Sequence, residues 1–252
     1  MVGVGALLVA SGAGSLWAAS RAEPPARAAG AVVPVVVELF SSEGCSSCPP
    51  ADAYLAELDR AQHIDGVTIL ALEEHVDYWD YLGWRDPFSQ ATFTARQRQY
   101  ASVLDHRVYT PEIVVDGRAI LEPGDKPQAV RATQASSREP KARIGLNRRG
   151  DRLAVDVNDV PSATGDDAAE VWLAVTESGL STRVERGENA GRMLAHAPVV
   201  RALRKLGTVS AGAPFHVEAG VDADPAWKPQ ALRVVVFVQR VKSRRIVGAT
   251  AI

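Results

Sequence analysis

The sequence predicts an α/β fold in which an α/β region comes first and a mostly β, sandwich-like region follows. Up to residue 139, continuous apolar runs alternate with amphipathic segments, as expected for strands that alternate with helices. Beyond Glu139-Pro140, short alternating segments are separated by Gly, Pro and Asp, which is typical of a β-sandwich. The chain has 252 residues, of which 46% are hydrophobic, and this is enough for two cores. We therefore expect two domains, at 31–139 and 140–252.

The α/β region is expected to contain a strand, a helix, a strand, a helix, two strands and a helix. A β-branched run predicts the first strand, and one apolar face predicts the helix after it. Asp86-Pro87 suits an N-cap and first-turn proline, Asp116-Gly117 suits a two-residue hairpin turn, and Asp125 suits another N-cap. The expected elements are strand 31–40, helix 51–61, strand 66–74, helix 86–104, hairpin 111–121 and helix 126–137.

The C-terminal region is expected to hold about six or seven strands. Residues 141–157 alternate on both sides of a tight turn at Arg149-Gly150-Asp151, which predicts a hairpin. The segments VWLAVTE, APFHVEA, ALRVVVFVQR and RIVGATA read as further short strands. One helix is expected in this region, over 196–206.

Residues 1–30 are expected to be a secretory signal peptide and a linker, because a short apolar run is followed by a polar, proline-rich stretch. The protein is therefore expected in the periplasm or outside the cell, with an uncleaved membrane anchor as the alternative. No other membrane association is expected. A formal net charge of -2 argues against a nucleic-acid partner, which would favour a basic surface.

The two cysteines of the chain, in Cys45-Ser46-Ser47-Cys48, lie between a predicted buried strand and an amphipathic helix. A thiolate there would face free backbone N–H groups and the positive end of the helix dipole, which favour the reactive anion. The second sulfur could then resolve a mixed disulfide formed by the first. We expect an accessible redox pair in which Cys45 attacks and Cys48 resolves. The partner would be a protein thiol or disulfide, and no cofactor beyond the redox-active disulfide is required.

The order strand–CxxC–helix–strand–helix–strand–strand–helix resembles the thioredoxin superfamily. Thr110-Pro111, followed by EIVVDG, is similar to the glutaredoxin segment in which a cis-proline opens the third strand beside the CxxC sulfurs. This resemblance implies that Thr110 and Pro111 shape a substrate groove. Together with VELFSSEGCSSCPPAD, HVDYWDYLGWRDPF and RGENAGRMLAHAPVVRAL, it resembles the exported thioredoxin-like family catalogued as domain of unknown function 1223. That likeness implies a thioredoxin-like fold and export, with no assigned activity.

Three further features are candidates for the site. Glu38 could be a proton relay beneath the cysteines, or only a solvated or ion-paired glutamate at a strand end. Trp79 and Trp84, in the aromatic segment 75–88, could line a groove for an extended polypeptide, or form a satellite hydrophobic cluster. Residues 183–203 are expected to form an interdomain loop, with a lid over the redox site as the alternative.

The expected function is that of an exported thiol–disulfide oxidoreductase, and two alternatives stay open. The chain could be a copper or zinc carrier, because Cys45 and Cys48 would need further ligands that His75, His106 or His196 could supply. It could also be a non-enzymatic binding protein in which the pair is a permanent disulfide. So short a loop would add only modest stability.

Overall fold

The computed structural model describes residues 1, 32–62, 64–163 and 165–252, so the expected signal peptide and linker lie outside the described residues. None of the described helices is long and apolar enough to cross a lipid bilayer. The elements are β1 Val33–Ser41, α1 Pro49–Ala61, β2 Val67–His75, η1 Asp80–Leu82, α2 Ala91–Val103, β3 Glu112–Val115, β4 Ala119–Leu121, α3 Lys126–Ser137, β5 Arg143–Arg149, β6 Arg152–Asn158, β7 Ala169–Glu177, β8 Ser181–Arg183, β9 Met193–Ala195, β10 Val199–Val209, β11 Phe215–Gly220, η2 Pro229–Ala231, β12 Leu232–Arg240 and β13 Ile246–Ala251.

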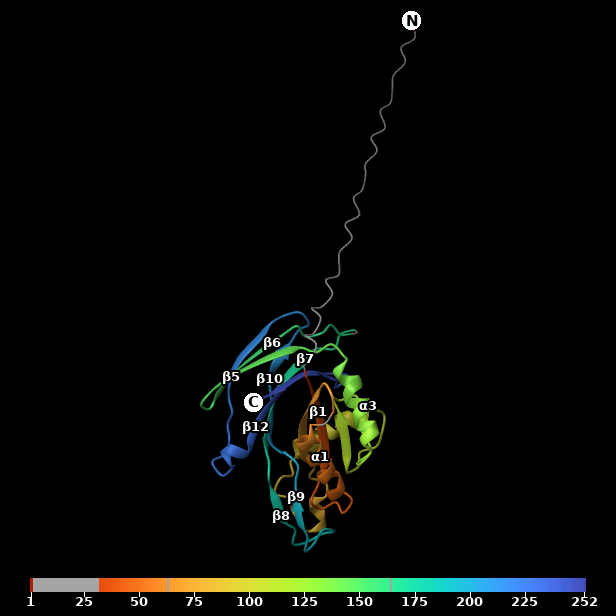
Figure 1. The fold of residues 1–252 in the computed structure, drawn as a ribbon, viewed down its shortest axis with the longest axis vertical. Helices are drawn as coiled ribbons and strands as arrows, with labels where there is room; N and C mark the ends of the chain where they lie inside the picture. The colour runs from red at the N-terminus through yellow and green to blue at the C-terminus, as the bar shows by residue number, and fades with distance from the viewer. Residues whose placement is uncertain (2–31, 63, 164) are drawn as a thin grey trace. The chain divides into compact units, whose positions relative to one another are not determined.

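Eight strands form one mixed sheet in the order β13-β12-β7-β10-β2-β1-β3-β4. Of these, β1, β7, β10 and β12 are labelled in Figure 1. β1 pairs in parallel with β2 and antiparallel with β3, which in turn pairs antiparallel with β4. β10 joins β2 in parallel, with Val199 opposite Glu73. Strands from before and after residue 140 therefore share one continuous sheet.

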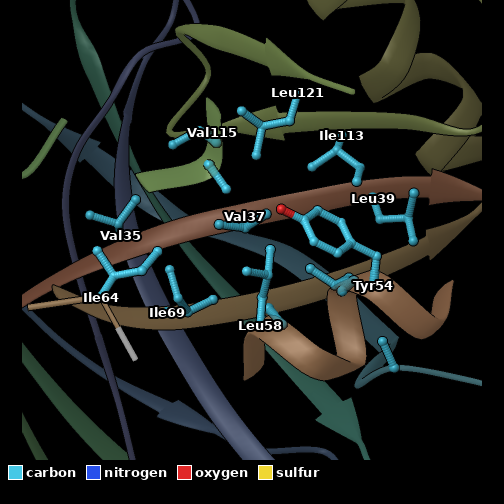
Figure 2. Packing of buried hydrophobic residues seen from close by; sticks show 14 of the residues in the cluster. Val35, Val37, Leu39, Tyr54, Leu58, Ile64, Ile69, Ile113, Val115 and Leu121 are labelled. Carbon is cyan, nitrogen blue, oxygen red and sulfur yellow. The ribbon is translucent and has the colours of Figure 1, made fainter. Parts of the chain in front are cut away.

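Side chains of β1 point alternately to two apolar layers, as the pleat of a strand requires. Val37 and Leu39 face α1 and α3 in a core that also contains Leu55 (Figure 2). Val36 faces the opposite side, where Phe93 of α2 packs with side chains of β2, β10 and β12. Both faces of β1 are thus buried, as its continuous apolar sequence predicts, and α1 covers one of them.

The C-terminal strands form a second layer. A three-stranded sheet, β11-β6-β5, packs against β7 and β12 of the large sheet through an apolar core. Leu153 and Val155 contribute from β6, while Leu173 and Val236 contribute from β7 and β12. The sheet under this second layer also contains strands from before residue 140, so a separate sandwich-like domain stays a prediction.

Two helices expected from the sequence are corrected by the structure. The helix expected from Asp86 begins at Ala91, with Gln90 as its N-cap. The Asp86 carboxylate accepts hydrogen bonds from the Phe88 and Glu43 N–H groups, so it holds a turn and a distant loop before the helix starts. The helix expected at 196–206 is absent: from Val199 this segment belongs to the strand β10, which pairs with β7 on one side and β2 on the other. Two register shifts in β10 interrupt its alternation, so the apolar residues fall at helical spacing although the backbone pairs as a strand. The described part of the chain also has nine strands after residue 140, more than expected.

The expected hairpin turn at Asp116-Gly117 and the expected N-cap at Asp125 are confirmed. Asp116 and Gly117 both have positive φ, 45° and 63°, as the two-residue hairpin turn between β3 and β4 requires. A Cβ at Gly117 would collide with the Arg244 carbonyl, so this glycine also allows a close backbone approach. The Asp125 carboxylate accepts a hydrogen bond from the Gln128 N–H at the start of α3.

Residues 32–252 form one compact unit, and the expected boundary at 139–140 stays a prediction. A buried ionic group contributes to the joint between the two regions. Arg96 of α2 donates to the Glu38 carboxylate at 2.6 Å and to the side-chain oxygen of Gln239, in β12, at 2.8 Å. Because all three side chains are buried, this group ties α2 to strands from both halves of the sequence.

Candidate functional site

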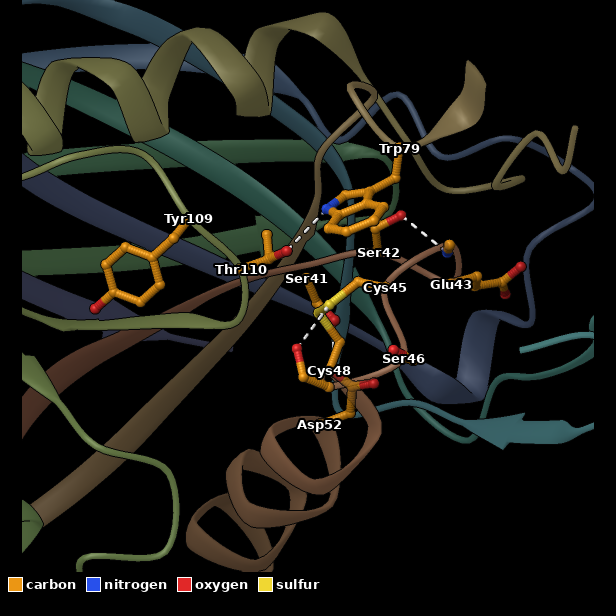
Figure 3. The surroundings of a disulfide bond; sticks show 12 residues. Ser41, Ser42, Glu43, Cys45, Ser46, Cys48, Asp52, Trp79, Tyr109 and Thr110 are labelled. Atoms are coloured by element: carbon orange, nitrogen blue, oxygen red, sulfur yellow. Dashed lines mark hydrogen bonds between the residues drawn. A yellow bond between two sulfur atoms is a disulfide. The ribbon is translucent and has the colours of Figure 1, made fainter. Parts of the chain in front are cut away.

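The two cysteines form a disulfide at the start of α1, as the strand–CxxC–helix pattern predicts (Figure 3). Cys48 occupies the N-cap position, and the helix begins at Pro49. The Cys48 backbone N–H donates to the Cys45 carbonyl, which closes the turn between them. The disulfide thus lies where the chain passes from the end of β1 into its first helix.

Both cysteines are 0% exposed, so the expectation of an accessible sulfur pair is wrong for this conformation. Only the two residues between them, Ser46 and Ser47, are exposed. The Ser47 hydroxyl lies 3.3 Å from the Cys45 sulfur. The disulfide is therefore buried, although the turn that carries it reaches the surface at Ser46 and Ser47.

The β8–β9 loop, residues 184–192, lies on the CxxC turn. The Asn189 side-chain amide donates to the Glu43 and Cys45 carbonyls, at 2.9 Å each. The Ser46 N–H donates to the Glu188 carboxylate at 3.1 Å. A segment more than 140 residues further along the chain therefore contacts the cysteine turn, as the lid alternative for 183–203 requires.

The two candidate tryptophans both direct their indole N–H groups inward. Trp79 donates to the Thr110 hydroxyl at 2.8 Å and packs on Gly44, where an added Cβ would approach its Cβ to 2.9 Å (Figure 3). Trp84 donates to the Glu43 carboxylate at 2.7 Å. Both rings are half-buried, and each secures a loop beside the disulfide. Their role in substrate binding stays a prediction.

The Thr110-Pro111 segment lies beside the disulfide, as Trp79 and Thr110 show in Figure 3. The peptide bond between Thr110 and Pro111 is cis, in keeping with the glutaredoxin resemblance. Tyr109, immediately before it, is 41% exposed and provides apolar surface at this place. The structure therefore brings together the two motifs that the sequence separates by more than sixty residues.

Asp52, which was not predicted from the sequence as a site residue, is a buried acid beside the disulfide (Figure 3). It accepts a hydrogen bond from the Ser41 hydroxyl at 2.5 Å. Burial, and next the negative charge of Glu73, raise the pKa of this carboxyl well above its usual value. The spacing in the sequence could have predicted this acid. Residues four apart on a helix share a face, and Asp52 is four residues after Cys48.

Glu38, the relay expected from the sequence, belongs to a different group. Its carboxylate oxygens accept hydrogen bonds from Arg96 at 2.6 Å and from the Tyr100 hydroxyl at 2.5 Å. Consecutive side chains of a strand point to opposite faces. Glu38 is thus on the α2 side of β1, whereas Ser41 is on the α1 side. Glu38 as a relay stays a prediction, and the structure offers Asp52 as the acid next to the cysteines.

The candidate histidines lie among carboxylates. His75 has Glu73 at 3.0 Å from one ring nitrogen and Asp86 at 2.6 Å from the other. Burial alone would lower the pKa of His75, but the charges and hydrogen bonds of these two carboxylates raise it well above its usual value. His196 contacts Glu73 at 3.3 Å, and the pKa of His196 is raised to about 9 because its carboxylate partners outweigh burial.

His106 lies elsewhere, 3.2 Å from the Glu112 carboxylate. The expected metal alternative combined cysteine thiolates with a histidine. In this structure the sulfurs are joined to each other, and the ring nitrogens of His75 face carboxylates. That ligand set stays a prediction for the reduced protein.

These features define a mixed α/β protein with a disulfide at the start of its first helix, of the kind that persists outside the reducing cytosol. A model of the family described as "Protein of unknown function (DUF1223)" matches residues 36–239. The chain belongs to this family, as the sequence motifs suggested.

Solved structures include one extensive match. Protein AGR_C_4864 from Agrobacterium tumefaciens is 28% identical to this chain, with a TM-score of 0.67, and the match covers 88% of this chain and 94% of that one. A DUF3823 family protein from Bacteroides ovatus is 16% identical over 44% of this chain and 53% of its own, with a TM-score of 0.27. Among curated proteins, none matches the sequence.

Proposed function

We propose that this protein is a thioredoxin-like thiol–disulfide oxidoreductase that acts on protein thiols in the periplasm or outside the cell. The observation that carries the proposal is the Cys45–Cys48 disulfide at the N-cap of α1, next to the Thr110-Pro111 segment. The order β2-β1-β3-β4, with β1 and β2 parallel and β3 and β4 antiparallel, supports the thioredoxin-like assignment. The disulfide itself supports a non-cytosolic location.

In the oxidising direction, a substrate thiolate attacks the Cys45 sulfur. The bond between Cys45 and Cys48 breaks, and Cys48 leaves as a thiolate that takes up a proton. A second substrate thiolate then attacks the substrate sulfur of the mixed disulfide, and Cys45 leaves. The substrate loses two electrons, which the cysteine pair gains. In the reducing direction Cys45 attacks a substrate disulfide, and Cys48 resolves the mixed disulfide.

Asp52 is placed to exchange the proton of Cys48, since the two residues share a face of α1. A buried carboxyl with a raised pKa holds a proton to give to a leaving thiolate, and it accepts one in the reverse direction. This role depends on position as well as acidity, because Asp52 lies on the disulfide side of β1 (Figure 3).

Exchange at a buried disulfide requires movement of the β8–β9 loop, because Asn189 and Glu188 hold it on the cysteine turn. Val108 and Tyr109, which are exposed in the segment that leads to Thr110, then provide apolar surface suited to an extended polypeptide. The proposed substrate class is therefore a protein rather than a small thiol.

The test is a redox titration of the purified protein in glutathione buffers, with alkylation of free thiols and mass spectrometry. Equilibration between about -120 and -270 mV is expected for an exchange protein. A Cys48→Ser variant should trap a mixed disulfide with a reduced protein substrate through Cys45. The matched Cys45→Ser variant should trap much less.

One observation favours a second candidate, a binding protein with a structural disulfide: both cysteines are buried. That candidate predicts a potential below about -300 mV and no trapped intermediate. Stoichiometric metal that blocks alkylation of the reduced cysteines would instead favour the metal carrier.

A further inference from the structure

Glu73, His75 and His196 form a buried cluster whose ligand atoms all lie within 4.8 Å of one another. Glu73 and His75 are two residues apart on β2, so they point to the same face of the sheet. His196 is brought to them by the chain that enters β10, where the Glu73 N–H donates to the Pro198 carbonyl. Residues distant in sequence thus converge on one oxygen, Oε1 of Glu73.

The two distances from the Glu73 oxygen to the imidazole nitrogens suit a metal ion. Oε1 of Glu73 lies 3.0 Å from Nε2 of His75 and 3.3 Å from Nδ1 of His196. An ion about 2.0–2.1 Å from each ligand requires neighbouring ligand atoms to be about 3.0–3.4 Å apart. Two imidazoles and a carboxylate are also a ligand set that divalent first-row transition metals favour.

The far side of each imidazole faces a carboxylate. Asp86 lies 2.6 Å from Nδ1 of His75, and Glu43 lies 3.1 Å from Nε2 of His196. Metal-binding histidines almost always donate their other N–H to such a partner, which orients the ring and fixes its tautomer. The other Glu43 oxygen accepts from Trp84, so this outer carboxylate is itself held in place.

A second observation points independently to a ligand. Oε2 of Glu73 is buried and has no hydrogen-bond partner among the described residues. A buried carboxylate oxygen without a partner is costly and rare. Hydrogen bonds within the cluster leave this oxygen unexplained, whereas an ion between the imidazoles and Glu73 would lie within reach of both carboxylate oxygens.

We propose that Glu73, His75 and His196 bind one divalent transition-metal ion of the zinc class, without any sulfur ligand, with Asp86 and Glu43 orienting the two imidazoles. The site lies beside the CxxC turn, since Glu43 precedes Cys45 by two residues, but it does not depend on the redox state of the cysteines. It is therefore separate from the proposed exchange reaction.

The experiment uses the purified protein, from which metal is removed with a chelator before titration with Zn²⁺. Native mass spectrometry and competition with a chromophoric chelator should report one tightly bound ion per chain. The affinity should fall at least about 100-fold in Glu73→Gln and in His196→Gln, and about 10- to 100-fold in Glu43→Gln. His216→Gln is the matched control, because this exposed histidine also pairs with a carboxylate, Asp156, at 2.7 Å, yet its loss should leave binding unchanged.

A Cys45→Ser/Cys48→Ser double variant separates this site from the proposed function, since it abolishes exchange and should retain the ion. Loss of the ion in that variant would overturn the proposal in favour of thiolate ligation. If the ligand variants do not fold, the absorption spectrum of Co²⁺ bound to the unaltered protein tests the ligand set. We expect no sulfur-to-cobalt charge-transfer band, and the presence of that band would overturn the proposal. Failure of the unaltered protein to bind a stoichiometric ion would overturn it as well.

Discussion

Removal of the Asn189 side-chain amide should make the disulfide easier to reduce. In Asn189→Ala, the β8–β9 loop loses its two hydrogen bonds to the Glu43 and Cys45 carbonyls. Both sulfurs are buried, so their reduction requires a local opening of the structure. We expect this opening to include the β8–β9 loop, because Asn189 binds the backbone of the cysteine turn. The substitution should therefore raise the population of these open conformations while the rest of the fold stays intact.

The two hydrogen bonds set the size of the effect. A typical protein hydrogen bond contributes about 1 kcal/mol net, so their loss should favour opening by about 2 kcal/mol. Since about 1.4 kcal/mol corresponds to a factor of ten, the open population should rise about 30-fold. When opening and closing are fast relative to reduction, the observed rate follows this population.

The assay is the rate of reduction by dithiothreitol under native conditions, followed by alkylation and mass spectrometry. Asn147→Ala, on the exposed strand β5, is the matched control and should reduce at the unaltered rate. Urea unfolding of each oxidised variant separates local opening from general destabilisation. A rate within about twofold of the unaltered protein, in a variant of normal stability, would refute the role of the β8–β9 loop as the cover of the disulfide.

Three further predictions concern buried ionisable groups. Asp52→Asn keeps the shape of the side chain without its proton, so thiol–disulfide exchange near pH 7 should slow by roughly tenfold or more; an unchanged stopped-flow rate and pH profile would contradict the relay. Arg96→Ala leaves the Glu38 carboxylate buried without its cation, and the free energy of unfolding in urea should fall by about 3–5 kcal/mol; a fall below about 1 kcal/mol would be incompatible with this pairing. Burial raises the pKa of Glu112 from 4.5 to about 7, although Gln97 and His106 favour its ionised form. The contribution of neutral Glu112 to the free energy of unfolding should thus be complete below about pH 4.5 and lost as the pH rises through about 7, by at most about 3 kcal/mol. Glu112→Gln should remove this dependence of the unfolding free energy on pH. An equal dependence in the two proteins would contradict the prediction.

Local patterns predicted much of the N-terminal region. The β-branched run of β1 and the caps and turns at Asp116-Gly117 and Asp125 depend on neighbours in sequence, and the structure has them as expected. The position of the disulfide at the start of α1 follows from the same local order. Such features are predictable because their hydrogen bonds and dihedral angles involve only a few consecutive residues.

Strand β10 shows where local patterns fail. Its apolar residues fall at helical spacing, but pairing with β7 and β2 supplies backbone hydrogen bonds and burial that a helix at this place could not have. The two register shifts conceal its alternation from any window of sequence. Tertiary pairing therefore overrides a weak local preference.

From the sequence alone follow the family, the α/β start, the β-rich end and the nearness of Cys45 and Cys48 to the first helix. Only the tertiary structure decided that the sulfurs are buried, that Asn189 lies on their turn, that Asp52 rather than Glu38 is the neighbouring acid, and that His196 meets Glu73. The physical reason is distance along the chain. Periodicity and caps describe contacts within a few residues, whereas burial and the pairing of charges arise between segments that meet only after the chain has folded.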